Sequence, residues 1–199
     1  MSTAIENRYP VIFLVGLHGV GKTTVGKALV ARGFRHISLG DLSRMLRRKQ
    51  IPAGYPLRFL RMLAAHEPGE RMASQLVVQL LEVIAEHSKH APLVVDGFPA
   101  EPYQVLDIPL KSHIIELTCA EKTRTDRLES RSLETPRKWN PDMDSRRDRQ
   151  LNALLNVALE REGLFVSSLE NEFISASQLA KTIHEDLVVK SQTRGIINA

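Results

Sequence analysis

The residues with the clearest chemical potential lie near the N-terminus, where Gly16 to Thr23 read Gly-Leu-His-Gly-Val-Gly-Lys-Thr. They match the pattern G-x-x-x-x-G-K-[ST], in which a glycine-rich turn directs backbone N–H groups at phosphate oxygens. In this pattern Lys22 reaches the β- and γ-phosphates and Thr23 binds Mg²⁺. We therefore predict a site for ATP and Mg²⁺ whose nucleotide-contacting residues are Gly16, His18, Gly19, Val20, Gly21, Lys22, Thr23 and Thr24.

The segments on either side of this pattern have the character that a phosphate loop requires. Val11 to Val15 is an uninterrupted apolar run, which is typical of a strand buried on both faces of a parallel sheet. A helix is expected from about Lys22 to Arg32, ended by Gly33, and its N-terminus adds a partial positive charge. His18, inside the loop, is expected to offer its backbone N–H and not to act as a catalyst.

The rest of the chain alternates apolar strands with helical patterns, which predicts a parallel sheet with right-handed crossovers. We expect an α/β fold, namely a three-layer P-loop NTPase fold with a parallel sheet of about five strands, flanking helices and a short lid. The chain is expected to form a single domain over 1–199, with its core at about 9–190. The further strands are predicted at 34–38, 93–95, 113–117 and 164–166, and the further helices at 41–49, 57–66, 70–87, 121–131, 145–162 and 175–189. The polar stretch 132–144 is predicted to be a mobile loop.

Composition narrows the class of protein. The 199 residues are 43% hydrophobic, enough for one core, and the longest apolar runs are too short to span a membrane. The net charge of +4 comes with only 5% aromatic residues, so a pocket for nucleotide phosphates is favoured over nucleic acid binding by base stacking. A single cysteine excludes an internal disulfide and a four-cysteine zinc site. We expect a cytoplasmic protein, a monomer or small homo-oligomer, whose partner is a small-molecule nucleotide acceptor.

Two later segments resemble the adenylate kinase branch of the nucleoside monophosphate kinases. The first reads Ser-Leu-Gly-Asp-Leu-Ser-Arg over 38–44, and the second reads Val-Val-Asp-Gly-Phe-Pro over 94–99 and is followed by Gln104. The resemblance covers about 9–190 and implies ATP-dependent phosphoryl transfer to a nucleoside monophosphate-like acceptor. It implies that Arg44 clamps the acceptor phosphate, Asp96 holds Mg²⁺ through water and Gln104 contacts the acceptor base. The acceptor-binding helices would span about 40–90, and the residues facing the acceptor would be Gly40, Asp41, Arg44, Gly97, Phe98 and Gln104.

The segment Asp-Arg-Leu-Glu-Ser-Arg over 126–131 resembles the helix that leads into the lid of this family. By that resemblance Arg127 stacks on the ATP base and Arg131 meets phosphate. Arg137 fits the short form of the lid, which would span about 131–145. The last phosphate-binding arginine of the family falls among Arg146, Arg147 and Arg149, with Arg147 or Arg149 preferred. The arginines and lysine expected to act in catalysis are Lys22, Arg127, Arg131, Arg137, Arg147 and Arg149.

Two departures from the family pattern leave the acceptor open. Ala100 stands where the family has an arginine that grips the acceptor phosphate, and Leu39 stands where it usually has threonine. Arg58, Arg61 or Arg71 could supply the missing cation from the predicted acceptor-binding helices. The acceptor could be AMP, another monophosphate, a deoxynucleotide or a phosphate-bearing cofactor precursor.

Three other functions also remain open. One is phosphorylation of a hydroxyl group, as in dephospho-coenzyme A kinase-like proteins, with Asp41 as the base. The second is nucleotide sensing with weak catalysis, which the replacement at Ala100 suggests. The third is an ATPase that moves an RNA or protein partner.

Overall fold

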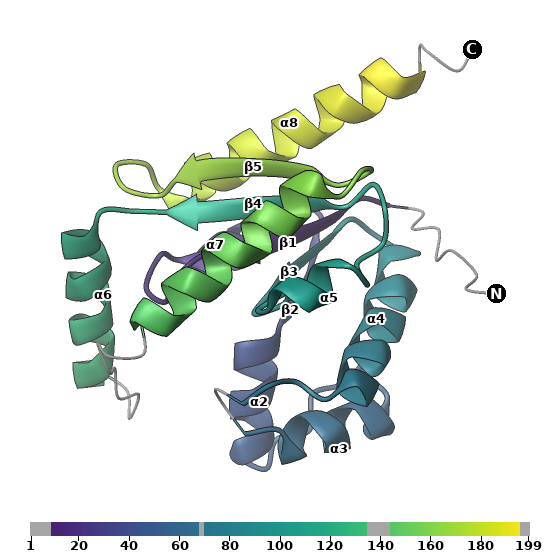
Figure 1. Cartoon of the computed structure of the whole chain (residues 1–199), viewed down its shortest axis with the longest axis vertical. Coiled ribbons are helices and arrows are strands. Elements are labelled where there is room, and N and C mark those ends of the chain that lie inside the picture. The colour runs from purple at the N-terminus through teal and green to yellow at the C-terminus, as the bar shows by residue number, and fades with distance from the viewer. Residues whose placement is uncertain (1–8, 68–69, 135–143, 196–199) are drawn as a thin grey trace.

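The central strand of the sheet is the apolar run ahead of the glycine-rich turn. Residues Val11–Val15 form β1, and all five are buried, because side chains on both faces of the strand are covered by helices. In the computed structural model, which describes residues 9–67, 70–134 and 144–195, β1 pairs in parallel with a strand on each side. The sheet has five parallel strands, as predicted, and their order is β2-β3-β1-β4-β5 (Figure 1). The other strands are β2 (Arg35–Ser38), β3 (Leu93–Asp96), β4 (His113–Thr118) and β5 (Phe165–Glu170).

Alternate residues of β1 pack into two separate cores. Ile12 and Leu14 face the cluster made with α1 and α8, whereas Val11 and Phe13 face the larger cluster made with the remaining core helices. Figure 1 shows α7 crossing one face of the sheet and α8 lying along the other. The described helices are α1 (Lys22–Val30), α2 (Leu39–Arg47), α3 (Leu57–Ala65), α4 (Ser74–Ser88), α5 (Pro102–Val105), α6 (Glu121–Glu134), α7 (Asp144–Glu160) and α8 (Ala176–Gly195).

Two helices of the segment predicted to bind an acceptor begin at other residues than the sequence prediction gave. Helix α2 begins two residues early, because the Ser38 hydroxyl accepts a hydrogen bond from the Asp41 N–H and caps it. Helix α4 begins at Ser74 instead of residue 70. The backbone just before it is held elsewhere, since the Tyr103 hydroxyl donates to the Met72 carbonyl at 2.9 Å.

The sequence prediction missed one short helix and ended one strand too early. The short helix α5 was not predicted, because its four residues are fewer than a helical period can reveal. Strand β5 continues four residues past Val166 and ends at Glu170, through residues that are mostly polar and exposed at the sheet edge.

Helix α6 extends to Glu134, whereas the expected lid from 135 to 143, including Arg137, lies outside the described residues. Among the described helices, none combines the length and apolar character needed to cross a membrane.

Candidate active site

The glycine-rich turn joins the carboxyl end of β1 to the start of α1, the position expected of a phosphate loop. Gly21 is the residue before α1, with φ at 94°, and a Cβ atom there would lie 2.4 Å from Asn171 Nδ2. Gly16 has φ at 133°, and a Cβ atom there would lie 2.4 Å from the Leu117 carbonyl oxygen. Both positions therefore need glycine for backbone conformation and for close approach. His18 is exposed at the tip of the loop and lines the cavity beside it, and Val20 is buried underneath.

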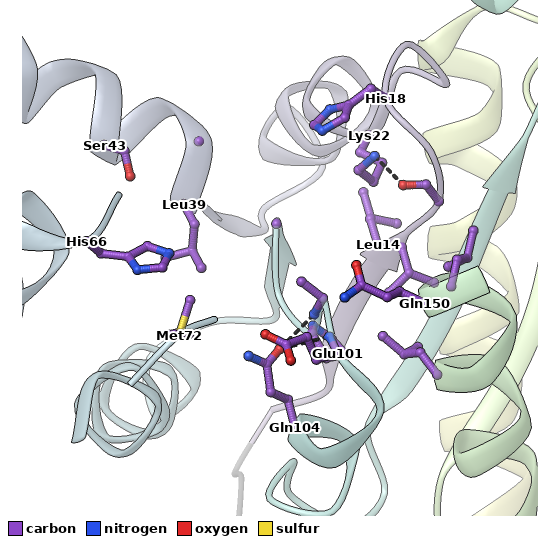
Figure 2. Close-up of a pocket in the computed structure, with 18 of the residues that line it drawn as sticks. Leu14, His18, Lys22, Leu39, Ser43, His66, Met72, Glu101, Gln104 and Gln150 are labelled. Carbon is purple, nitrogen blue, oxygen red and sulfur yellow. Dashed lines mark hydrogen bonds between the residues drawn. The ribbon is translucent and has the colours of Figure 1, made fainter. Parts of the chain in front are cut away.

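Lys22 folds back over the loop that precedes it. Its Nζ atom donates to the carbonyl oxygens of Gly16 and Leu17, both at 2.6 Å (Figure 2). Burial lowers the pKa of Lys22 to about 8, the carboxylate of Asp96 partly opposes that shift, and Arg131 adds to it. The ammonium group is thus held by two carbonyl oxygens, which a phosphate oxygen can replace. The buried site around it favours a strongly anionic partner.

This low pKa predicts that nucleotide binding depends on pH. Phosphates favour the protonated amine, so above a pKa of about 8 binding must also take up a proton, whereas below it this group adds no pH dependence. We expect the Kd of a non-hydrolysable ATP analogue to rise between about pH 7.5 and 9.5, approaching roughly tenfold per unit at the upper end. Isothermal titration calorimetry measures the Kd and the proton uptake. The matched variant Lys22→Arg stays charged and should lose this dependence; an equal pH response in both proteins would contradict the assignment.

Asp96 is the hub of a buried polar cluster at the end of β3. Its Oδ1 accepts from the Ser38 hydroxyl at 3.0 Å and from the Thr23 hydroxyl at 3.3 Å, and its Oδ2 lies 2.7 Å from His36 Nε2. The side chains of Asp96 and His36 are only 6% and 8% exposed, so the cluster fixes the carboxylate rigidly beside the first turn of α1. His36 and Ser38 were not anticipated as partners of Asp96. The signal was their alternation along β2, which places both side chains on the same face of the sheet as Asp96, the residue paired with Ser38 in β3.

The donor set fits Mg²⁺. Mg²⁺ prefers oxygen ligands and is usually held by one or two carboxylates together with substrate phosphates. Thr23 and Asp96 offer a hydroxyl and a carboxylate in contact with each other. Within the described part of the chain, no cluster of three or more histidine, cysteine or acidic residues could hold a metal by itself.

The arginines of α6 approach the phosphate loop from the carboxyl end of β4, where Figure 1 shows α6 standing. Arg127 donates to the Asn171 carbonyl oxygen at 3.0 Å. Burial lowers the pKa of Arg131, and the nearby charge of Arg44 lowers it further. Arg44 belongs to α2 and Arg131 to α6, so cations of two separate elements lie near each other. Arg147 and Arg149 lie in the first turns of α7, and their side chains fall outside the description.

The loop after β5 completes the phosphate site, and sequence analysis missed it. Asn171 is buried, and its Nδ2 donates to the Val20 carbonyl oxygen at 2.7 Å. The next residue, Glu172, accepts from the Ala120 N–H at 2.7 Å and from the Thr123 hydroxyl. These bonds and the charge of Arg127 lower the pKa of Glu172. The strand was predicted to end at 166, so Asn171 was not recognised as a polar residue at a carboxyl strand end.

A cavity of about 620 Å³ adjoins the phosphate loop and extends toward α2 and α3. Figure 2 shows Lys22 and His18 on one side of it, Ser43 and His66 on the opposite side, and Glu101 and Gln104 between them. Its apolar walls include Leu39, Leu63, Met72, Leu151 and Leu154. Its cations are Lys22, Arg44, Arg47 and Arg71. The carboxylates of Glu70 and Glu101 also line it, so cations are in excess. A volume of this size suits a small molecule, and the excess of positive charge suits an anion.

The acceptor-side predictions meet in this cavity, with some side chains already engaged. Gly40, Arg44, Gly97 and Gln104 line it. Asp41 forms ion pairs with Arg44 and, at 3.7 Å, with Lys27. Phe98 is fully buried and packs edge-on against Phe13, so it supports the cavity floor. Thr24 is exposed on α1, beyond Thr23.

Of the three arginines considered as replacements at Ala100, Arg71 is the one that lines the cavity. Its guanidinium lies 4.4 Å from the ring centroid of Tyr103 and its Nε lies 3.9 Å from a Glu101 carboxylate oxygen. Ala100 and Glu101 line the cavity next to it. Arg71 and Ala100 thus line the same cavity although they lie in separate segments of the chain.

A phosphate loop at the carboxyl end of the central strand, in a parallel sheet of this order, defines a P-loop nucleotide-binding fold of the kind found in kinases. The chain matches the family model described as "AAA domain" over residues 12–152, more than two thirds of its length, and therefore belongs to that family.

Comparisons with individual proteins agree with the resemblance to P-loop kinases. A UMP-CMP kinase from Prunus armeniaca is 34% identical over 90 residues, a match that covers 45% of this chain and 37% of that protein. A gluconokinase from Sinorhizobium meliloti 1021 superposes with a TM-score of 0.58 and 14% identity, covering 98% of this chain and 100% of that one. The Deinococcus radiodurans tunicamycin resistance protein gives 0.53 and 19%, covering 90% of this chain and 96% of that one. At these identities the two structures bear on the fold, and the fold class predicted from sequence is confirmed.

Proposed function

We propose that this protein transfers the γ-phosphoryl group of ATP to a small acceptor that carries a phosphate, of the nucleoside monophosphate kind. One observation carries the proposal: the cavity is bordered at one end by the phosphate loop with Lys22 and farther away by Arg44, Arg47 and Arg71. Two anionic molecules can therefore be held in one cavity with their phosphates facing, which is what in-line transfer requires. Residues 40–90, which contain most of α2 and all of α3 and α4, would form the acceptor-binding segment.

In the proposed reaction, an oxygen of the acceptor phosphate attacks the γ-phosphorus. The bond from that phosphorus to the β–γ bridging oxygen breaks, and ADP leaves with the electron pair. The acceptor oxygen is already an anion, so no protein base is needed. Thr23 and Asp96 would hold Mg²⁺, which neutralises charge on the transferring group, and Lys22, Arg44 and Arg131 would surround the phosphates.

The state of Asp41 favours a phosphate acceptor over a hydroxyl acceptor. A hydroxyl would need a base, and Asp41 was the residue considered for that role. Its carboxylate is paired with Arg44 and lies 3.7 Å from Lys27, so cations already occupy it. Such pairing favours a positioning role for Asp41, in which it orients Arg44 toward the cavity.

The proposal is tested by an acceptor panel and by Arg71. Purified protein with Mg·ATP should phosphorylate at least one of AMP, CMP, GMP, UMP, dTMP and IMP, measured by ADP release and product chromatography. For the preferred acceptor, Arg71→Ala should raise KM about tenfold with little change in kcat, because a charge-assisted contact to bound phosphate is lost at a site open to solvent.

Arg61→Ala is the matched control, since Arg61 is an exposed arginine of α3 outside the cavity lining. It should leave KM unchanged. If the two substitutions raise KM equally, Arg71 contributes only to the overall positive charge and makes no specific contact with the acceptor phosphate. ATP binding without turnover of any phosphate-bearing acceptor, while dephospho-coenzyme A or gluconate is consumed, would replace this proposal with a hydroxyl kinase.

A further inference from the structure

The buried side chain of Asn171 holds one particular peptide group of the phosphate loop. Asn171 follows β5 and is 6% exposed, and its Nδ2 donates to the Val20 carbonyl oxygen at 2.7 Å. That carbonyl belongs to the trans peptide between Val20 and Gly21. Because a trans peptide is planar, its carbonyl and its N–H point in opposite directions. The hydrogen bond from Asn171 to the carbonyl therefore turns the Gly21 N–H away from Asn171.

This peptide group has little restraint of its own. Gly19 and Gly21 flank Val20 with φ at 87° and 94°, a region that glycine enters without steric penalty, so the loop backbone alone does not fix which way the peptide faces. Within the described part of the chain, no group accepts a hydrogen bond from the Gly21 N–H. The orientation of the peptide thus depends on its carbonyl side, where the Asn171 amide lies so close that a Cβ atom on Gly21 would be 2.4 Å from Nδ2.

Asn171 can act as an anchor because its own backbone is fixed from two directions. Its N–H donates to the Thr118 carbonyl at 2.8 Å, at the end of the pairing between β4 and β5. Its carbonyl accepts from Arg127 Nη2 at 3.0 Å, which connects it to α6. The direction of its side-chain amide is also determined, since turning the amide over would set Oδ1 against the Val20 carbonyl oxygen.

We propose that Asn171 is a positioning residue for phosphoryl transfer, which holds the Val20–Gly21 peptide so that the Gly21 N–H faces the phosphates of the bound nucleotide. Backbone N–H groups of such a loop bind phosphate oxygens when they point into its concave side. A donor that is already oriented before the nucleotide arrives needs no reorganisation during the reaction. This role rests on the ATP-binding half of the proposed function and does not depend on the identity of the acceptor.

Asn171→Asp tests the role by reversing the polarity of the anchor at nearly unchanged size. At neutral pH a carboxylate cannot donate to the Val20 carbonyl and attracts the Gly21 N–H instead, so the peptide should turn over. We expect the Kd of a non-hydrolysable ATP analogue with Mg²⁺ to rise about tenfold or more, because a charge-assisted hydrogen bond to phosphate is lost. The melting temperature of the nucleotide-free variant should stay close to that of the wild type, since the carboxylate gains the Gly21 N–H as a partner.

Two further variants separate this role from a general effect on the fold. Asn171→Ala removes the anchor without reversing it, and should raise the Kd by a smaller factor of about three to five. Asn156→Asp makes the same change of charge at an exposed position of α7, and should leave the Kd unchanged. Wild-type Kd values in both Asn171 variants would overturn the role of Asn171. If Asn171→Asp does not fold, the Kd of Asn171→Ala and the wild-type spectrum described next decide.

Nuclear magnetic resonance can observe the Gly21 N–H directly. With ¹³C in the valine carbonyls and ¹⁵N in the glycines, a carbonyl-correlated amide spectrum contains only the glycines that follow a valine, namely Gly16, Gly21 and Gly26. On addition of the ATP analogue and Mg²⁺, the amide proton of Gly21 should move downfield as it donates to a charged oxygen. Gly26, inside α1, is the internal reference. Asn171→Asp should abolish the movement of the Gly21 signal.

The spectrum also distinguishes failure of this inference from failure of the proposed function. If the wild-type protein binds the analogue and the Gly21 signal does not move, the positioning role is overturned and the proposed kinase function stands. If the wild-type protein does not bind the analogue, the proposed function has failed, and the positioning role with it.

Discussion

Lys22→Ala is expected to lower the rate of phosphoryl transfer by at least about 100-fold, because one preorganised cation aimed at the transferring group is worth that much or more. The alanine removes the only side-chain ammonium among the described residues that line the cavity. It also releases the Gly16 and Leu17 carbonyls, which Nζ now binds at 2.6 Å. Steady-state kinetics with the preferred acceptor measures the effect on kcat, and calorimetry measures the affinity for an ATP analogue.

The stability of Lys22→Ala should not fall with its activity. Holding Lys22 in a site where burial lowers its pKa to about 8 is itself unfavourable below that pH, so removing the charge there should leave the melting temperature unchanged or higher at neutral pH. Lys181→Ala, which removes an exposed lysine of α8, serves as the matched control for both measurements. Activity within about threefold of wild type would place the phosphates elsewhere.

Asp96→Asn should reduce activity by about 100-fold or more and should also reduce stability. The amide keeps the shape of the carboxylate but loses the negative charge that supports Mg²⁺. It also places an N–H donor among three groups that now share the carboxylate, namely the Thr23 and Ser38 hydroxyls and the His36 ring. We expect the free energy of unfolding to fall by about 1–3 kcal/mol, since buried hydrogen bonds to a charged group are weakened. Denaturant titration measures this change.

The metal dependence distinguishes the two roles of Asp96. If the carboxylate supports Mg²⁺, the variant should need a higher Mg²⁺ concentration for half-maximal rate, whereas a purely structural role would leave that concentration unchanged. Asp186→Asn, at an exposed position of α8, changes charge by the same amount and should alter neither activity nor stability. A fully active Asp96→Asn protein with normal metal dependence would remove Asp96 from the site.

The sheet and the phosphate loop could be predicted because their signals are local. Continuous apolar runs occur at Val11 to Val15 and at Leu93 to Val95. Such runs are typical of strands that are buried on both faces of a parallel sheet. The loop pattern fixes Lys22 and Thr23 by spacing alone. Asp96 was expected beside the loop because it ends a buried strand, and its Oδ1 accepts a hydrogen bond from the Thr23 hydroxyl. Its role toward Mg²⁺ stays a prediction.

The acceptor side was less accessible to sequence because its contacts join distant segments. Tyr103 donates a hydrogen bond to the Met72 carbonyl, and its ring lies under the Arg71 guanidinium. Both contacts depend on how α5 packs beside the segment before α4. No sequence pattern within either segment predicts that packing. Gln104 shows the same limit. Its position was predicted, but the direction of its amide depends on a turn at Ala100 and Glu101 that closes on the side chain. The prediction that it contacts a base stays a prediction.

The hydrogen bond from Asn171 to the Val20 carbonyl bears on how this chain can be divided. The family match ends at residue 152. Asn171 lies 19 residues beyond that point, and its hydrogen bond to the Val20 carbonyl stabilises the phosphate loop. A fragment cut at that boundary would retain every residue of the phosphate-loop pattern and lose the buried support that holds its turn. It would also lose β5 and α8, which cover one edge and one face of the sheet. The segment that the family model matches is therefore shorter than the segment that supports the phosphate loop. A fragment made for expression should include Asn171, β5 and α8.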